Sequence, residues 1–166
     1  GSKSSPLWKT SPKWYNKTGP ALEVYSIFNP SNNSKEVNRI VGVGFGINKK
    51  LLGTNSYFNE NLGRRPGSLL GGEETELCNR AREKGLKIYY ISSSKVKHQI
   101  QQDRMGFNWL MNRFFYGGVG KAYIKGTPEI QSKQYSLKDK IFILIISPAY
   151  IAGYIYGRLK NVRKIN

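Results

Sequence analysis

Three glutamates, Glu73, Glu74 and Glu76, follow a Gly-Gly pair in the stretch LLGGEETELCNRAREKG. The chain has 27 Lys and Arg against 10 Asp and Glu, so this concentration of acid is unusual in it. A carboxylate at the start of a helix can take a proton from a hydroxyl group whose oxygen attacks an electrophilic carbon. Negative side chains also stabilise a helix N-terminus by about 0.3 to 1 kcal/mol each, and composition alone favours this structural role.

The segments around these acids have the patterns of elements that would position them. ETELCNRAREKG predicts a helix with Leu77, Cys78 and Ala81 on one face, closed by a glycine suited to a helix end. Upstream, RIVGVGFGINKKLL predicts a buried strand, a turn and the start of a helix. Downstream, LKIYYI and KVKHQI predict two short strands on either side of a serine turn.

Three zones follow from the pattern along the chain. Residues 1–38 are rich in Pro, Ser, Asn and Lys, and we interpret them as a loop-rich lead segment with one strand candidate, Leu22 to Phe28. Residues 39–126 form the ordered middle, which ends in a helical pattern that Gly117-Gly118 is expected to interrupt. Residues 136–166 begin with the helix-capping pattern SLKD and continue into an apolar helix with a basic tail.

Residues 141–157 carry no charged side chain, and this run predicts a membrane-associated helix. Its length is at the short edge of the roughly 20 residues that span a bilayer. Tyrosines followed by the basic segment GRLKNVRK are typical of a membrane interface. Three alternatives remain open: an interfacial helix, a span whose positive flank lies in the cytoplasm, and an ordinary buried helix.

The composition limits what the chain can be and what it can bind. Its 166 residues suit one domain, and 39% hydrophobic and 13% aromatic residues suffice for a globular core. The net charge of +17 favours anionic partners such as nucleic acid, acidic lipid headgroups or phosphate-bearing small molecules. The single cysteine, Cys78, excludes an internal disulfide framework and fits a reducing compartment.

Taken in order, these motifs resemble the C-terminal half of family-2 glycosyltransferases of the GT-A fold. The shared order is Gly-Gly, an acidic pair, a helix closed by Gly, an aromatic strand, Val-x-His, and a downstream Arg, Trp and Arg. The matching residues are Gly71, Gly72, Glu73, Glu74, Glu76, Leu77, Arg80, Gly85, Val96, His98, Arg104, Trp109 and Arg113. The stretch VGFGINKKLLGTNSYFNENLG also resembles the family's loop that enters the acceptor site. The resemblance implies an α/β fold, a partial GT-A (Rossmann-like) domain with short strands and flanking helices.

The resemblance also implies roles for the acidic pair and its neighbours. In inverting members the second acid is the catalytic base, and that role falls on Glu74, where the usual residue is Asp. Glutamate extends the carboxylate by a methylene, and a displacement of about 1 Å is enough to weaken catalysis severely. Glu73, Gly72 and Trp109 are the corresponding acceptor-binding residues.

The basic residues and the histidine have roles implied in the same way. Arg104 and Arg113 correspond to residues that bind phosphate, although they can also be solvated edges of a packed helix. In some relatives the histidine matching His98 joins an Asp-x-Asp pair to hold Mn²⁺ or Mg²⁺ on the donor's pyrophosphate. A backbone hydrogen bond at a strand end is the alternative for His98, and one histidine cannot make a metal site.

The sequence departs from the family's pattern in one respect. Its two aspartates, Asp103 and Asp139, lie far apart, so it contains no Asp-x-Asp motif. The N-terminal half, which supplies nucleotide binding and the metal-binding acids in the family, is missing from it. We expect a shortened chain, a split enzyme whose other half is a second chain, or a degenerate remnant with a binding role.

Two classes of function follow. The first is a glycosyltransferase, or part of one that is inactive alone, acting at the cytoplasmic face of a membrane. It would transfer a sugar from a nucleotide-diphosphate sugar to a saccharide or lipid-linked hydroxyl acceptor. The second is a non-catalytic basic module that binds a membrane or a protein partner. The uncharged run at residues 141–157 disfavours nucleic acid, and the acidic cluster disfavours a purely lipid-binding role.

Overall fold

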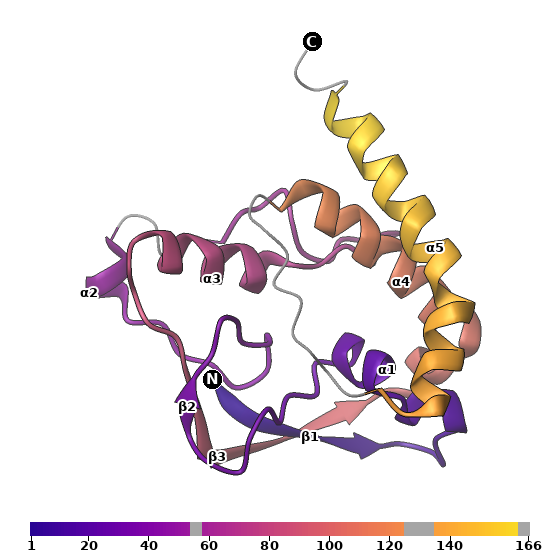
Figure 1. Ribbon diagram of the computed structural model, residues 1–166, viewed down its shortest axis with the longest axis horizontal. Helices are drawn as coiled ribbons and strands as arrows, with labels where there is room; N and C mark the ends of the chain where they lie inside the picture. The colour runs from indigo at the N-terminus through magenta and orange to yellow at the C-terminus, as the bar shows by residue number, and fades with distance from the viewer. Residues whose placement is uncertain (54–57, 125–134, 163–166) are drawn as a thin grey trace.

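The structure is a computed structural model that describes residues 1–53, 58–124 and 135–162. It is a mixed α/β chain with a small sheet on one side and helices on the other, as Figure 1 shows, and the predicted α/β class is confirmed. Its elements are β1 (Ser2–Trp8), the 3-10 helix η1 (Trp14–Lys17), α1 (Gly19–Val24), β2 (Lys35–Glu36), α2 (Lys49–Leu52), α3 (Glu73–Glu83), β3 (Tyr89–Ile100), the 3-10 helix η3 (Gln102–Met105), α4 (Phe107–Tyr123) and α5 (Leu137–Val162).

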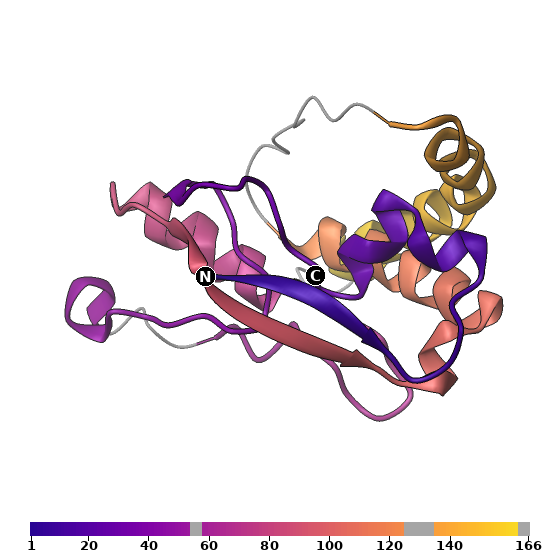
Figure 2. The same cartoon turned by 90° about the horizontal axis from the view of Figure 1, so that it is seen from below.

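The sheet has the strand order β1-β3-β2, with β1 parallel and β2 antiparallel to β3. Figure 2 shows β1 lying along β3. The register shifts between Ser2, which pairs with Ile91, and Lys3, which pairs with Lys95. The prediction of two strands separated by a serine turn is therefore wrong. The serines between Ile91 and Lys95 stay within one strand, and the register shift accommodates them as a bulge does.

The strand predicted from Leu22 to Phe28 is also wrong, because α1 begins just before it. The Thr18 hydroxyl accepts a hydrogen bond from the Ala21 amide at 3.4 Å, and Pro20 lies in the first turn. Both features favour a helix start. The strands of the lead segment are instead β1 and β2, which depend on pairing with β3.

The strand predicted within residues 39–48 is absent from the structure, whereas the helix start after it is confirmed. Gly44 has a φ of 65°, which is incompatible with an extended strand. The Asn48 side chain then caps α2 by accepting hydrogen bonds from the amides of Lys50 and Leu51 at 3.1 and 3.3 Å. The helix predicted over ETELCNRAREKG is confirmed as α3. It buries Leu77, Cys78 and Ala81, as expected.

The helix α4 runs without a break through Gly117-Gly118, contrary to the prediction. These glycines lie where α4 crosses α5. A Cβ atom on Gly118 would collide with the carbonyl oxygen of Tyr150, and one on Gly153 would collide with the carbonyl oxygen of Phe115. The glycines therefore allow two helix backbones to approach closely, as small residues do in helix pairs.

The capping pattern predicted at the start of α5 is confirmed. Asp139 accepts hydrogen bonds from the amide and hydroxyl of Ser136, and the Ser136 hydroxyl accepts one from the Asp139 amide. Asp139 also accepts a hydrogen bond from the Gly19 amide at 2.7 Å, which ties α5 to α1. The main core lies between these helices and the end of β3, and its buried residues are Ala21, Tyr25, Ile100, Met105, Leu110, Phe114, Phe142 and Ile146.

Among the described residues, one helical stretch, Leu137–Lys160 of α5, is long and apolar enough to cross a membrane. Its mean hydropathy is 1.5, and 22% of its apolar window is buried inside the protein. Length and composition are weak evidence by themselves, because the core helix of a soluble protein can pass the same test. The predicted apolar C-terminal helix is nevertheless present.

We expect the Gly118→Ala variant to be destabilised, because its Cβ would push α4 away from the backbone of α5. The expected loss is about 1 to 3 kcal/mol, as for other overpacked contacts. Gly117→Ala is the matched control, since a Cβ there would lie 3.7 Å from the Tyr150 ring, an ordinary contact. Thermal denaturation in detergent measures both variants, and equal melting temperatures would contradict the close crossing.

Candidate functional site

The acidic pair begins helix α3, directly after the Gly-Gly turn. Gly72 is the N-cap residue and has a φ of 112°, a conformation that side chains rarely adopt. A Cβ atom on Gly72 would also lie 2.7 Å from the Cδ1 atom of Ile124. The turn therefore requires glycine at this position. It places Glu73 and Glu74 in the first helical turn, where the helix dipole stabilises negative charge.

Glu74 is partly buried and lies against the backbone of Gly42. A Cβ atom on Gly42 would collide with the Oε1 atom of Glu74. Burial, followed by repulsion from Glu73, raises the pKa of Glu74, while hydrogen bonds from the backbones of Glu74 and Gly42 and the charge of Arg113 oppose the shift. A carboxylate with a raised pKa is a better proton acceptor than an ordinary surface glutamate.

Both acids line a cavity of about 370 Å³, a size within the range of small-molecule sites. Its lining residues come from the segment before α2, from the loop between α2 and α3, and from the start of α3: Gly42, Phe45, Phe58, Asn59, Glu60, Leu62, Glu73 and Glu74. The cavity thus combines three carboxylates, those of Glu60, Glu73 and Glu74, with aromatic and amide side chains. Such a lining can bind a hydroxylated ligand and accept a proton from it.

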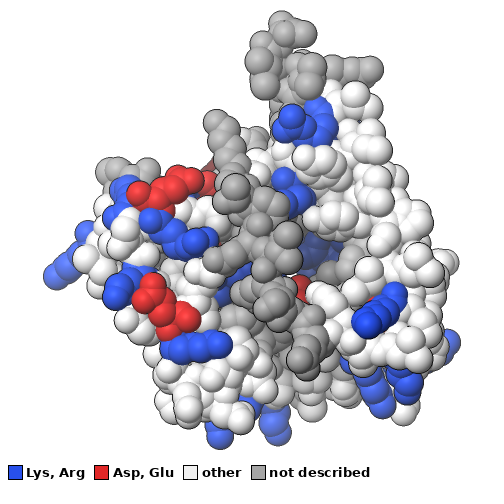
Figure 3. Space-filling model, viewed as in Figure 1, with Lys and Arg blue, Asp and Glu red and all other residues white. Residues whose placement is uncertain are grey.

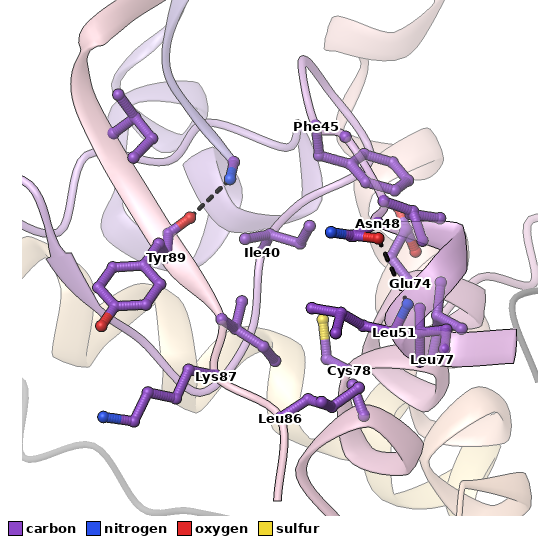
Figure 4. A pocket seen from close by; sticks show the side chains of 17 residues that line it. Ile40, Phe45, Asn48, Leu51, Glu74, Leu77, Cys78, Leu86, Lys87 and Tyr89 are labelled. Atoms are coloured by element: carbon purple, nitrogen blue, oxygen red, sulfur yellow. Dashed lines mark hydrogen bonds between the residues drawn. The ribbon is translucent and has the colours of Figure 1, made fainter. Parts of the chain in front are cut away.

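Glu74 also borders a second, mostly apolar pocket of about 320 Å³. Figure 4 shows this pocket between α3 and the start of β3, with Phe45 and Glu74 on one side and Tyr89 on the other. The Cys78 side chain points into it. Because burial raises the pKa of the Cys78 thiol, this cysteine has little thiolate character and is a poor nucleophile.

Arg113 lies beside the acidic turn. Its Nη1 atom donates a hydrogen bond to the Leu69 carbonyl at 2.9 Å, and its Nη2 atom would lie 3.0 Å from a Cβ on Gly71. The guanidinium therefore supports the backbone that leads into the Gly-Gly turn. Within the described structure, the buried Nε atom of Arg113 and the buried Oε2 atom of Glu73 have no hydrogen-bond partner.

Arg64 is a member of the site that the sequence reasoning missed. Burial is the main cause that lowers the pKa of Arg64, and Arg104 lowers it further, while the charges of Glu73 and Glu74 oppose the shift. Arg64 thus lies within the electrostatic field of the acids and of Arg104. Burial lowers the pKa of Arg113, and Arg64 lowers it further. The available signal was the basic pair in GRRPG, a glycine- and proline-containing turn just before the acidic helix.

His98 makes the backbone hydrogen bond that was the alternative to a metal role. Its Nδ1 atom lies 2.7 Å from the Tyr25 carbonyl oxygen, which can only accept, so Nδ1 carries the proton. Burial is the main cause that lowers the pKa of His98, and Arg104 and Arg64 lower it further. The neutral ring keeps the Nε2 lone pair, as a metal ligand must. In the described part of the chain, however, no group of three His, Cys, Asp or Glu side chains could hold a metal ion.

Trp109 lies in the core and not at the acidic cavity. Its ring stacks on Tyr25, with centroids 5.7 Å apart and planes at 11°. Tyr25 in turn donates a hydrogen bond to the backbone carbonyl of Arg104 at 3.1 Å. One face of Trp109 is therefore covered, and its acceptor-binding role stays a prediction. The structure brings together Glu73, Glu74 and Arg113 at one end of α3, with Arg104 near Arg64 and His98.

The fold and site define an α/β chain with a partly buried carboxylate pair at a cavity, basic side chains beside it and a long apolar helix. A curated protein with detectable sequence similarity is the glucosyl-dolichyl phosphate glucuronosyltransferase of Haloferax volcanii, which is 24% identical over 131 residues. The match covers 77% of this chain and 39% of that protein, so the chain spans about two fifths of its relative's length. No protein-family model matches the chain, and no solved structure matches it. The similarity supports a distant relationship to glycosyltransferases.

We expect the Glu74→Gln variant to be at least as stable as the parent near neutral pH. A raised pKa means that the folded state holds the Glu74 proton more tightly than the unfolded state does. Stability therefore falls as the pH rises above the ordinary glutamate pKa of about 4.3 and through the raised folded value. Melting temperatures would be measured from pH 4 to 8. As the pH rises, the melting temperature of the parent should fall relative to that of Glu74→Gln. If the parent instead gains stability relative to Glu74→Gln over this range, the inference that burial raises the pKa of Glu74 is wrong.

Proposed function

We propose that this chain is the acceptor-side half of a family-2 glycosyltransferase of the GT-A fold, with Glu74 as the general base. The observation that carries the proposal is the partly buried carboxylate of Glu74, with its raised pKa, on the wall of a ligand-sized cavity. The distant similarity to a glucuronosyltransferase supports the same chemistry. The acceptor is a saccharide or a lipid-linked sugar, and the donor is a nucleotide-diphosphate sugar.

In the proposed reaction, the acceptor hydroxyl lies in the cavity and donates its proton to the Glu74 carboxylate. The hydroxyl oxygen forms a bond to the anomeric carbon of the donor. The bond from that carbon to the diphosphate oxygen breaks, and the nucleotide diphosphate leaves with the electron pair. Attack opposite to the leaving group inverts the anomeric centre, as in inverting members of the family.

The other residues have supporting roles in this proposal. Glu73 binds the acceptor from the wall of the same cavity. Gly72 gives the turn its shape, and Arg113 positions the turn from α4 while adding positive charge beside it. Arg104, joined by Arg64, binds phosphate.

In this proposal, nucleotide and metal binding need residues in addition to those that the structure describes. His98 can supply one ligand for Mn²⁺ or Mg²⁺, but the described residues do not complete a site. We propose that a nucleotide-binding half, on a second chain or on a longer form of this one, supplies the remaining acids. It would cover the apolar pocket of Figure 4, which the described residues leave open. The assembled enzyme would act at the cytoplasmic face of a membrane.

A non-catalytic basic module is the rival function, and the net charge of +17 favours it. Such a module would bind an anionic membrane or a protein partner through its Lys and Arg side chains, which are spread over the face shown in Figure 3. Its binding would weaken steeply with salt and would not depend on Glu74.

We expect Glu74→Gln to abolish sugar transfer, because the amide cannot accept the proton. The rate should fall by about 100-fold or more, the usual effect of losing a general base. Transfer from labelled nucleotide sugars to lipid-linked acceptors would be measured in membranes that contain the chain together with its nucleotide-binding half.

Glu76→Gln is the matched control for this measurement. Glu76 lies on the same helix turn but binds Arg80 at 2.7 and 2.9 Å. This control should keep its activity. Normal turnover by Glu74→Gln would refute the assignment, and salt-sensitive membrane binding without any transfer would favour the rival module.

A further inference from the structure

The helix α5 has two apolar faces, and within the described residues only one of them packs against the rest of the protein. The inner face contains the buried residues Phe142, Ile146, Gly153 and Gly157, which recur at helical spacing. The outer face is a continuous stripe of exposed aliphatic side chains: Leu137, Ile141, Leu144, Ile151, Ile155 and Leu159. Leu144 is 77% exposed and Leu159 is 62% exposed, so this stripe is not a part of the core.

Charged side chains flank the stripe only near its ends. Lys138 and Lys140 lie at its start, and Arg158 and Lys160 at its end. The surface over α5 is otherwise largely white in Figure 3. The Lys160 ammonium lies 4.9 Å from the centroid of the Tyr156 ring, an arrangement in which a cation sits beside an interfacial aromatic. Aliphatic side chains bounded by tyrosines and cations fit the boundary between lipid tails and anionic headgroups.

The packing of the inner face favours an in-plane helix over a membrane span. Around the first half of α5, the ring of Trp14 in η1 contacts Phe142, and the amide of Gly19 donates to Asp139. The stretch Leu137–Lys160 would be about 36 Å long at 1.5 Å per residue, so a centred span would place Phe142 and the η1 segment that contacts it within the roughly 30 Å hydrocarbon layer, with Asp139 and Gly19 at its edge. Irregular backbone exposed to lipid does not occur at that depth.

We propose that α5 lies in the plane of one leaflet, with the Leu137–Leu159 stripe in the lipid and the cations at both ends against anionic headgroups. This inference deepens the membrane location proposed above, but its tests do not depend on sugar transfer. The inner face of α5 packs against α4, and α4 contacts the backbone of the acidic turn at Gly71. A membrane-bound α5 would therefore keep the cavity at a fixed position relative to the membrane surface.

Vesicle flotation of the full chain tests the stripe. Binding to vesicles of phosphatidylcholine with phosphatidylglycerol should persist at high salt, because burial of apolar side chains is not screened. The double variant Leu144→Glu/Ile151→Glu should reduce the bound fraction by about tenfold or more. Leu51→Glu is the matched control, since Leu51 is 62% exposed on α2.

Leu51→Glu and Glu74→Gln should bind as the parent does. Circular dichroism checks that each variant is folded. Binding that disappears at high salt, or that survives the double variant, would overturn the proposal. Self-association through the stripe without any vesicle binding would overturn it as well, because the occupant would then be a second copy.

Labelling of the two helix ends separates an in-plane helix from a span. Lys138→Cys and Lys160→Cys are combined in a Cys78→Ser background, and the protein is added to sealed vesicles. A membrane-impermeant maleimide is then supplied outside the vesicles. An in-plane helix exposes both ends on the same side, so intact mass should show two labels per bound molecule. One label per molecule would show a span and overturn the proposal.

Discussion

Close backbone contact at the glycines of α4 is the constraint on which the arrangement of this protein depends. On one side, Gly118 allows α4 to touch the backbone of α5 at Tyr150. On another, a Cβ on Gly120 would lie only 2.6 Å from the carbonyl oxygen of Gly71, so the acidic turn also rests on the α4 backbone. Protein interiors pack densely and transmit displacements. The apolar helix and the carboxylate pair are thus held by one helix.

The pKa of Glu74 is shifted in the direction opposite to the one that the positive net charge of the chain would favour. With a net charge of +17, an isolated carboxylate should be easy to ionise, yet burial is the largest cause acting on Glu74 and raises its pKa. The buried Oε2 of Glu73 and Nε of Arg113 have no hydrogen-bond partner in the described structure. Each such atom costs about 1 to 3 kcal/mol unless a ligand or water satisfies it. The folded chain tolerates these costs beside the acidic turn, where the Arg113 guanidinium holds the Leu69 carbonyl.

The sequence predicted the elements that carry their own local signals. α3 and α5 have helical periodicity and identifiable ends, and both were found. The errors lie where distant segments decide the conformation: α4 continues through Gly118 because α5 packs there, and β3 stays whole because β1 pairs with it. The acidic pair was identified by resemblance, but Arg64 was missed because its place beside the acids arises only from the fold.

Glu74 and Gly42 are matched in shape, and the match depends on the length of the Glu74 side chain. The resemblance places aspartate at this position, and glutamate pushes the carboxylate outward by one carbon–carbon bond, about 1.5 Å. In the structure, the longer side chain reaches the backbone of Gly42, where any Cβ would collide with its Oε1 atom. The absence of a side chain at residue 42 therefore creates the space that the extra methylene needs. The position of the Glu74 carboxylate therefore depends on glycine at residue 42 as well as on the Gly-Gly turn that begins α3.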